Sequence, residues 1–273
     1  MAAPVRVVIA GAGGRMGQAL VKAVLGDAAL TLAGALDIAG SPELGRDPGQ
    51  RCGHASGIRV TSDVAVALAG ADVLIDFTRP AGTLAHLKAC AHARVAAVVG
   101  TTGLSEAEHA ALAQHAAHIP IVFAANMSVG VNVLLALVET AARSLGPDFD
   151  IEIVEMHHRH KVDAPSGTAL RLGEAAAAGL GSRLPDVAVL SREGVTGERK
   201  AGTIGFAALR GGDVVGEHTV VYAGTGERIE ISHRATSRHN FAAGALRAAH
   251  FVAARRAAGQ AGLFDMRDVL GLA

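Results

Sequence analysis

The sequence predicts an α/β protein, built from a Rossmann-like doubly wound parallel sheet plus a second α+β domain with a mixed or antiparallel sheet. Two observations lead to this fold class. Up to about residue 128, short apolar runs alternate with helical stretches, the order expected of right-handed βαβ units. After residue 150, strand candidates follow one another across glycine-rich turns, which favours antiparallel pairs.

Composition narrows the class of protein further. The chain has 273 residues, 50% of them hydrophobic, and its 25 Lys and Arg residues balance 25 Asp and Glu residues. A globular protein is expected, and zero formal charge argues against dedicated binding to nucleic acid or to an anionic membrane surface. Cys52 and Cys90 form no CxxC motif, and no secretory signal precedes them. We therefore expect a cytoplasmic protein without a structural disulfide.

One uncharged stretch has the length of a membrane span. It extends from Ile119 to Val138. Polar residues such as Asn126 divide it, however, and the chain has no Trp and one Tyr with which to form an interfacial aromatic belt. We expect a strand at 121–124, a polar loop and a buried helix at 129–145, and no membrane segment.

The first predicted strand and helix enclose a glycine turn. Residues 5–10 form a mostly apolar strand, and an amphipathic helix extends to about Leu25. Between them lie Gly11, Gly14 and Gly17, one residue away from the usual GxGxxG spacing. Glycines let the backbone approach a pyrophosphate, whose charge the helix N-terminus stabilises. This context of strand, turn and helix predicts a dinucleotide site.

An acidic residue follows the second predicted strand. Residues 30–36 are mostly apolar, and Asp37 follows them. The Asp37 carboxylate can accept hydrogen bonds from the ribose hydroxyls of a dinucleotide. The same carboxylate would repel the 2′-phosphate of NADPH, and the next residue, Ile38, offers neither charge nor donor to offset this. We therefore predict NADH as the preferred cofactor, with NADPH as the weaker one.

Polar or small loops follow three further predicted strands. The strands are expected at 73–77, 96–99 and 121–124, with helical stretches at 81–91 and 105–118 between them. Their loops are Thr78–Pro80, Gly100–Gly103 and Ala125–Ser128. Each loop alone is compatible with ordinary turn chemistry. As a set, they lie at the carboxyl edge of the sheet, where open α/β sheets bind ligands.

The stretch from Glu155 to Thr168 contains most of the candidate chemistry. It follows an alternating strand at 150–155 and precedes a predicted helix at 169–176. His157–Lys161 place five basic or titratable side chains at the strand end. The turn Pro165–Thr168 leads into a helix start, whose free N–H groups form an anion site. Together these features predict a pocket for a substrate that contains carboxylates.

Two other interpretations of this stretch come from residue types alone. His157, His158 and His160 are a histidine-rich run, but no Cys or well-spaced carboxylate accompanies them, so we predict no metal. A basic run is also typical of a nucleic-acid patch or a solvated loop. The rest of the chain shows no basic excess, which argues against nucleic acid, whereas the solvated loop stays an alternative.

A second domain is expected at 129–238, as a substrate-binding and oligomerisation domain inserted into the dinucleotide-binding domain at 1–128 and 239–273. Its later strand candidates lie at 187–191, 203–208, 216–223 and 228–232. One face of their sheet is available to other subunits. A final apolar helix, from Phe241 to about Ala257, is expected to pack back on the first domain.

Six motifs together carry a family resemblance. They are Gly-Ala-Gly-Gly-Arg-Met-Gly at 11–17, Asp-Phe-Thr-Arg-Pro at 76–80, Gly-Thr-Thr-Gly at 100–103, Asn-Met-Ser-Val-Gly-Val-Asn at 126–132, Glu-Met-His-His-Arg-His-Lys-Val-Asp-Ala-Pro-Ser-Gly-Thr at 155–168 and Ser-Arg-Glu-Gly at 191–194. Over essentially the whole chain they resemble bacterial 4-hydroxy-tetrahydrodipicolinate reductase. The resemblance implies NAD(P)H-dependent reduction of a cyclic dicarboxylate in the diaminopimelate route of lysine biosynthesis. It also implies a homotetramer assembled through the second domain's sheet.

The resemblance also implies roles for individual residues. His157 would be the proton donor and Lys161 a second donor, while the substrate carboxylates would bind His158, Gly167 and Thr168. The implied cofactor contacts are Gly11, Ala12, Gly13, Gly14, Arg15, Met16, Asp37, Gly100, Thr101, Thr102, Ala124, Ala125, Asn126 and Met127. These roles agree with the chemistry, since hydride transfer adds charge to a ring that an acid must protonate and cations must stabilise.

Two other functions fit part of the sequence. An NADH-sensing regulatory protein would use the nucleotide fold without catalysis, although the sequence offers no DNA-binding element. An aspartate dehydrogenase-like enzyme would share the first domain, but it does not account for the anion site at Ser166–Thr168. NADH oxidation measured with and without the cyclic dicarboxylate separates these functions from the reductase.

Overall fold

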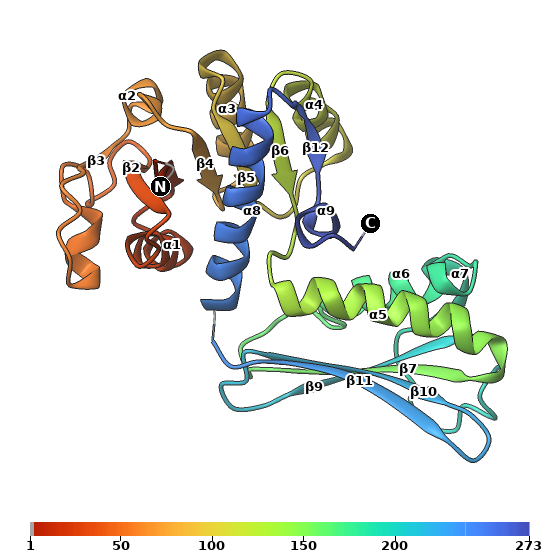
Figure 1. The fold of residues 1–273 in the computed structure, drawn as a ribbon. Helices are drawn as coiled ribbons and strands as arrows, with labels where there is room; N and C mark the ends of the chain where they lie inside the picture. Colours follow the sequence, from red (N-terminus) through yellow and green to blue (C-terminus); the bar gives the residue numbers. More distant parts are fainter. Residues whose placement is uncertain (1–2, 238, 273) are drawn as a thin grey trace. The chain divides into compact units, whose positions relative to one another are not determined.

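A computed structural model describes residues 3–237 and 239–272 of the chain (Figure 1). The chain divides into two compact units. Unit 1 comprises residues 1–129 and 239–273, and unit 2 comprises residues 130–238. Unit 1 therefore contains both ends of the chain, with unit 2 inserted between its two parts.

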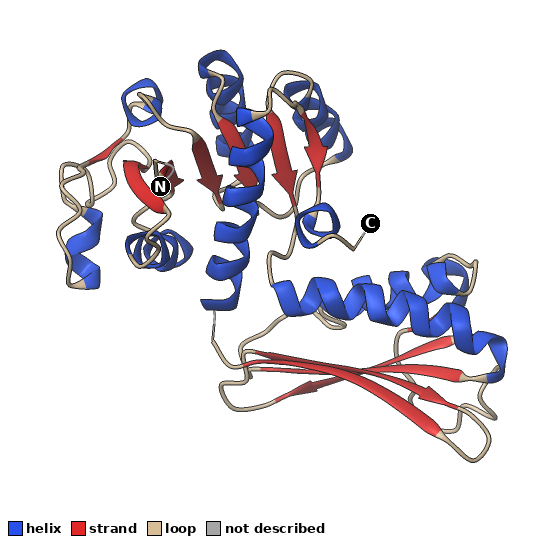
Figure 2. Cartoon of the chain, in the orientation of Figure 1, coloured by secondary structure: helices blue, strands red, loops and turns tan. Residues whose placement is uncertain are grey.

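Unit 1 is built on a sheet whose strand pairs are all parallel (Figure 2). Its strands are β1 (Val5–Ala10), β2 (Leu30–Leu36), β3 (Val60–Thr61), β4 (Val73–Asp76), β5 (Ala96–Val99), β6 (Pro120–Phe123) and β12 (Gly262–Phe264). They lie in the order β12-β6-β5-β4-β1-β2-β3. The chain leaves β1 toward β2 and returns on the other side of β1 at β4. The carboxyl ends of β1 and β4 therefore flank a topological switch point, where such sheets bind ligands.

Both faces of this sheet are buried. Val7 and Ile9 lie in one hydrophobic cluster, whereas Val8 and Ala10 lie in another. The covering helices are α1 (Arg15–Leu25), α2 (Val64–Leu68), α3 (Pro80–Ala93), α4 (Glu106–Ala116), α8 (His239–Ala257) and α9 (Met266–Leu270), with a 3-10 turn at Pro48–Cys52. Because successive strand residues face opposite layers, the strands of unit 1 are continuous apolar runs and not alternating ones.

Unit 2 contains a mixed sheet with the order β11-β10-β7-β9-β8. Its strands are β7 (Asp150–His157), β8 (Ala188–Val189), β9 (Ile204–Arg210), β10 (Gly216–Ala223) and β11 (Arg228–Ala235). Strand β10 is antiparallel to β7 and β11, while β9 is parallel to β7 and β8. The parallel sheet of unit 1 and this mixed sheet confirm the predicted fold class.

The helices of unit 2 cover one face of its sheet (Figure 1). They are α5 (Val129–Leu145), α6 (Gly167–Gly179) and the short α7 (Leu184–Val187), with a 3-10 turn at Gly146–Asp148. Val138 and Leu172 pack with Ile153, Val220 and Tyr222 in one core cluster. The hydroxyl of Tyr222 also donates to the Val138 carbonyl at 2.7 Å. Helix α5 is therefore tied to the sheet by both packing and a buried hydrogen bond.

The uncharged stretch noted in the sequence lies partly in α5. Within the described chain, one helical segment, 129–148, is long and apolar enough to cross a membrane by length and composition alone. Leu134, Val138 and Ala142 of this segment are buried in the core cluster of unit 2. The core helix of a globular domain passes the same test, and this packing assigns α5 to that class.

Several element bounds differ from the sequence-based prediction. The strand expected at 187–191 is only Ala188–Val189, because the preceding Leu184–Val187 forms a helical turn. Strand β7 continues two residues beyond Glu155, so His157 is part of the strand and not of the loop. Strands β3 and β12 and helices α2 and α9 were not predicted at all.

Candidate active site

The glycine turn between β1 and α1 adopts a conformation that larger residues would not permit. Gly11 has a φ of +68°, a region that side chains disfavour. A Cβ at Gly17 would lie 2.0 Å from the Gly11 carbonyl oxygen, so glycine at 17 allows α1 to approach the turn. Gly14 is the N-cap of α1, and its N–H donates to the Gly11 carbonyl at 3.0 Å. The backbone N–H groups of this helix start form a compact anion site.

Two acidic side chains lie beside the same turn. The N–H of Gly13 donates to Asp37 Oδ2 at 2.9 Å. A Cβ at Gly13 would lie 2.4 Å from Asp37 Oδ2 and 2.8 Å from Glu43 Cγ, so both side chains flank the turn. Glu43 is 7% exposed and forms an ion pair with Arg51, whereas Ile38 is 76% exposed. A ligand held by Asp37 therefore meets no cation at position 38, and the Glu43 carboxylate is already paired with Arg51.

A chain of hydrogen bonds supports the loops after β4 and β5. Asp76, 1% exposed, accepts from the Thr78 hydroxyl at 2.6 Å and lies 2.7 Å from His86 Nδ1. The Thr83 and Thr101 hydroxyls lie 2.7 Å apart. These buried contacts hold Thr101 at the carboxyl edge of the sheet, next to the exposed Thr102 and the buried Gly100.

The loop after β6 is fixed by backbone contacts. The N–H of Ala124 donates to the Val99 carbonyl at 3.1 Å, and Asn126 Oδ1 accepts from the Ser128 N–H at 2.9 Å. The Met127 side chain is fully buried in the core cluster of unit 1, and a Cβ at Gly244 of α8 would lie 1.7 Å from its carbonyl oxygen. Any ligand contact made by Met127 would therefore come from its backbone.

The fourteen predicted cofactor residues thus lie in loops, or in the first turn of α1, at one edge of the unit 1 sheet. They follow β1, β2, β5 and β6. Gly14, Arg15, Thr102 and Ala125 are exposed, while Ala12 and Thr101 are buried. The edge is the carboxyl one in every case, because all pairs of this sheet are parallel.

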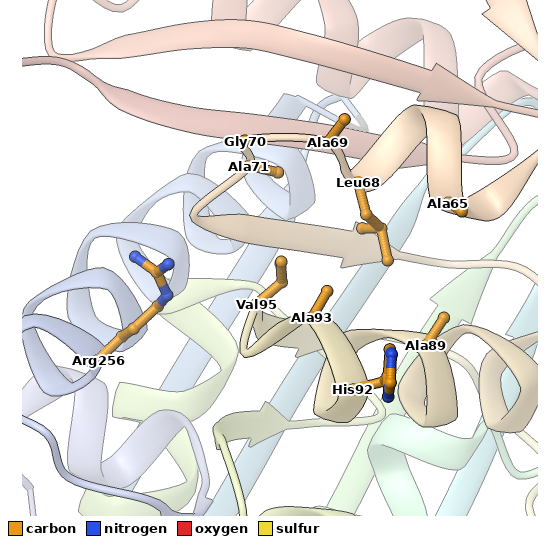
Figure 3. A pocket seen from close by; sticks show the side chains of 10 residues that line it. All are labelled: Ala65, Leu68, Ala69, Gly70, Ala71, Ala89, His92, Ala93, Val95 and Arg256. Atoms are coloured by element: carbon orange, nitrogen blue, oxygen red, sulfur yellow. The ribbon is translucent and has the colours of Figure 1, made fainter.

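A cavity of about 350 Å³ lies elsewhere in unit 1 (Figure 3). It is bordered by α2, α3 and the end of α8, and its lining is mostly alanine, with Leu68, Val95 and Arg256. The Arg256 guanidinium is already engaged by Asp72 at 2.8 Å and by the Arg94 carbonyl at 2.7 Å. None of the predicted site residues lines this cavity, and we assign no ligand to it.

In unit 2, the predicted catalytic histidine lies in a buried polar cluster. His157 ends β7 and is 9% exposed, and its Nδ1 lies 2.6 Å from Glu155 Oε2. Arg210 of β9 donates to both oxygens of Glu155 at 2.9 Å. The rings of His157 and His218 meet edge to face, with centroids 5.1 Å apart. The cluster therefore combines a carboxylate, a guanidinium and two imidazoles within one sheet.

Helix α6 begins beside this cluster. Ser166 is its N-cap, and the Ser166 hydroxyl accepts from the Ala169 N–H at 3.2 Å while lying 3.0 Å from His218 Nε2. Gly167 is exposed, and a Cβ placed there would meet no atom within 4 Å. The N–H groups of Gly167 and Thr168 thus belong to a helix start with open space beside it, which suits a carboxylate.

The loop between β7 and α6 carries the other predicted residues. Lys161 Nζ donates to Asp163 Oδ1 at 2.8 Å. This hydrogen bond lowers the pKa of Asp163, and its effect is larger than the opposing effect of burial, which raises the pKa. Nδ1 of His158 is buried without a hydrogen-bond partner among the described residues. Lys161 is one-fifth exposed. An ammonium held by one exposed carboxylate is able to exchange that partner for a ligand's carboxylate.

Sequence reasoning missed three members of this cluster, namely Glu155, Arg210 and His218. Glu155 was assigned only to the strand, and Arg210 lies beyond the predicted strand 203–208. For His218 a signal was present, because it alternates with Val220 and Tyr222 on the inward face of β10. Across residues 3–237 and 239–272, no group of three or more His, Cys, Asp or Glu side chains is placed to hold a metal ion.

Comparison with known proteins shows the family of the chain. The family model described as "Dihydrodipicolinate reductase, N-terminus" matches residues 5–127, and that described as "Dihydrodipicolinate reductase, C-terminus" matches residues 130–270. Two relatives named 4-hydroxy-tetrahydrodipicolinate reductase, from Burkholderia multivorans and Nitrosospira multiformis, are each 58% identical. The first match covers 98% of this chain and 99% of the relative, and the second covers 97% of each.

Solved structures share the fold. A dipicolinate-bound dihydrodipicolinate reductase from Paenisporosarcina sp. TG-14 matches with a TM-score of 0.75 at 22% identity, over 96% of this chain and 97% of that one. GenD2 from gentamicin A biosynthesis, solved with NAD, matches with a TM-score of 0.62 at 16% identity, over 100% and 92% of the two chains. At these identities the structures show the fold, whereas the family models and the close relatives show that the chain belongs to the dihydrodipicolinate reductase family.

Proposed function

We propose that the chain reduces 4-hydroxy-tetrahydrodipicolinate, through dihydrodipicolinate, to tetrahydrodipicolinate, with NADH as the preferred cofactor and His157 as the proton donor. Nicotinamide-dependent reductase activity in lysine and diaminopimelate biosynthesis follows from family membership. The observation that most supports the residue roles is the cluster in unit 2. It places an imidazole, an ammonium and an open helix start within one short segment, 157–168.

Each element of that segment has a task in the reaction. Gly167 and Thr168, at the start of α6, and His158 hold the substrate carboxylates. Lys161 leaves Asp163 and stabilises negative charge that develops on the ring. His157 gives a proton to the reduced ring, because an imidazolium is an acid of the right strength near neutral pH.

The residues of unit 1 fit a nicotinamide dinucleotide. Gly13 lets the Asp37 side chain, and Gly17 lets the Gly11 carbonyl, approach more closely than a Cβ would permit, as the tight turn of a pyrophosphate site requires. When bound, NADH supplies the hydride. Gly11–Met16 would hold the pyrophosphate, Asp37 would accept from the ribose hydroxyls, Gly100–Thr102 would line the nicotinamide side, and Ala124–Met127 would form the loop at the domain hinge.

The preference for NADH rests on charge around the ribose. Asp37 and Glu43 both flank Gly13, and Ile38 is exposed without a charge or donor. A 2′-phosphate would therefore approach the Asp37 carboxylate with no cation at position 38 to offset the repulsion. The remaining hydroxyl of NADH creates no such repulsion.

Unit 2 and the cysteines support the assembly and the location that we propose. The face of the unit 2 sheet opposite its helices contains Val154, Met156, Leu209 and Val221, which are half-buried or exposed. This face is the surface through which we place a homotetramer, in keeping with the role of unit 2 as substrate-binding and oligomerisation domain and of unit 1 as dinucleotide-binding domain. Cys52 and Cys90 are free thiols, as expected in the reducing cytoplasm where we place the reaction.

A coupled assay tests the proposal. The cyclic substrate is made fresh by the preceding synthase reaction, and oxidation of NADH is followed with and without it. We expect oxidation only when the substrate is formed. NADH binding without substrate-dependent oxidation would instead indicate a protein that senses the cofactor without catalysis.

A further inference from the structure

Glu155 and His157 lie on the same face of β7, because alternate residues of a strand point the same way. Glu155 Oε2 lies 2.6 Å from His157 Nδ1. The Glu155 side chain is 1% exposed and that of His157 is 11% exposed. The contact is therefore shielded from water, where a hydrogen bond to a charged group is strong.

The carboxylate of Glu155 is held from two other directions. Arg210, which faces His157 in the register of β7 and β9, donates Nη1 to Oε2 and Nη2 to Oε1, both at 2.9 Å. The Ser166 N–H donates to Oε1 at 3.1 Å. Burial acts to raise the pKa of Glu155, but the hydrogen bonds from Arg210 and His157 outweigh it and lower the pKa below its usual value. Glu155 is thus ionised at neutral pH.

An ionised carboxylate accepts hydrogen bonds and cannot donate them. Nδ1 of His157 must therefore carry a hydrogen in the neutral as well as in the charged ring. This leaves Nε2 as the atom that gains and loses the proton. A Cβ at Gly216 would lie 3.0 Å from Nε2, so glycine at 216 keeps space open at that atom.

From this geometry we propose that Glu155, clamped by Arg210, is a positioning residue that orients the His157 ring, fixes its tautomer and supports its charged form for proton donation. The inference rests on the proposed function of His157. In the step itself, the Nε2–H bond breaks, the electron pair stays on Nε2, and the proton goes to the ring that has received the hydride. The neutral imidazole keeps its Nδ1–H on Glu155, and it takes up a proton from solvent at Nε2 to regenerate the imidazolium for the next cycle.

The other groups around His157 do not take over this role. From β9, Arg210 is permanently charged and already engaged with Glu155. From β10, burial and then the neighbouring His157 lower the pKa of His218 to about 4, so His218 stays neutral at the pH of the reaction. From the loop after β7, Lys161 is paired with Asp163. Glu155 is thus the carboxylate in direct contact with the donor ring.

Glu155→Gln tests the proposal because it keeps the size of the side chain and removes its charge. In the coupled assay we expect kcat to fall roughly 10- to 100-fold, the range typical when the partner of a functional histidine is removed. The Kd of NADH should stay within about twofold of the wild type. The alkaline limb of the kcat profile should move to lower pH, because an amide no longer stabilises the charged ring.

Two further variants separate positioning from general destabilisation. Tyr222→Phe removes a buried hydrogen bond of the same unit without touching His157. It should lower the melting temperature while leaving the kcat profile where it is in the wild type. Glu155→Asp retains the charge on a shorter side chain. The alkaline limb of its kcat profile should therefore lie between those of Glu155→Gln and the wild type.

The tautomer supplies a readout that needs no variant and no turnover. In histidine labelled with ¹⁵N, the neutral form of His157 in the wild-type protein should carry its hydrogen on Nδ1. A neutral ring protonated on Nε2 would overturn the inference, as would a Glu155→Gln profile that coincides with the wild type. If His157→Ala retained wild-type turnover, the proposed function of His157 would be wrong, whatever Glu155→Gln shows.

Discussion

Ser166 Oγ lies 3.0 Å from His218 Nε2, and this contact ties the N-cap of α6 to β10 of the unit 2 sheet. His218 is 4% exposed, and burial lowers its pKa to about 4 from 6.5. Its Nδ1 finds no hydrogen-bond partner in the described part of the chain. A proton on this ring would therefore be costly in the folded state.

This cost predicts how stability depends on pH. The pKa of His218 is lower in the folded protein than in the unfolded chain. The contribution of the neutral His218 ring to the free energy of unfolding is therefore fully present above about pH 6.5 and is lost as pH falls toward 4. The shift corresponds to at most about 3 kcal/mol of unfolding free energy. Urea unfolding at pH 7.5, 6, 5 and 4, at fixed protein concentration, should show a steeper decline for the wild type than for His218→Gln. Parallel curves would assign the pH dependence to other groups.

Catalysis supplies a second prediction. If His157 donates the proton, His157→Ala should lower kcat by roughly a hundred- to ten-thousand-fold, while the Kd of NADH stays near that of the wild type. Calorimetric titration with NADH provides the control. An equal loss of NADH affinity would point to a structural histidine.

Lys161 gives a third prediction, through its coupling to His157. Lys161→Ala should cause a similar loss of kcat, since we propose that its ammonium stabilises charge on the ring. If both side chains serve one transition state, the double variant should lose much less than the product of the two single losses. Simple multiplication of the two losses in kcat would show that they act independently.

The main strands of unit 1 could be predicted from the sequence because both faces of the sheet are buried, which makes each strand a largely apolar run. The long helices could be predicted from the stretches between these runs. Helix α5 was predicted with its observed bounds, since the polar residues Asn126 and Ser128 precede its apolar run and Gly146 and Pro147 follow it. Strands β3 and β12 were missed because two or three residues carry no periodic signal. Their existence depends on pairing with β2 and β6, which is tertiary information.

The sequence likewise predicted only part of the candidate site. Residues close in sequence, such as His157 and Lys161, could be grouped by their spacing alone. Arg210 could not, because only the parallel register of β7 and β9 brings it opposite His157. Glu155 was placed on the strand, but its part in the site depends on Arg210 and on the start of α6.

Close packing of α8 on the loop after β6 gives a fourth prediction. A Cβ at Gly244 would lie 1.7 Å from the Met127 carbonyl oxygen, a backbone atom that cannot rotate away. Gly244→Ala should therefore destabilise the protein by roughly 1–3 kcal/mol, although alanine is otherwise favoured in helices. Thermal unfolding measures this, with Gly26→Ala as the control, because a Cβ there would meet only ordinary contacts at 3.5 and 3.6 Å. Equal melting temperatures for the two variants would contradict the prediction.

Cofactor preference is the subject of the last prediction. Asp37 and Glu43 flank Gly13, and Ile38 is 76% exposed without charge, so the wild type should have a higher kcat/KM with NADH than with NADPH. Ile38→Arg supplies a guanidinium able to make charge-assisted contacts with a 2′-phosphate, each worth about 1.5–3 kcal/mol when well placed. Because position 38 is exposed, we expect the ratio to shift toward NADPH by roughly ten- to a hundredfold at most. Leu263→Arg, which adds the same charge on β12 at the opposite edge of the sheet, should leave the ratio unchanged. A wild type that already favours NADPH, or an Ile38→Arg ratio equal to that of Leu263→Arg, would show that the phosphate is recognised elsewhere.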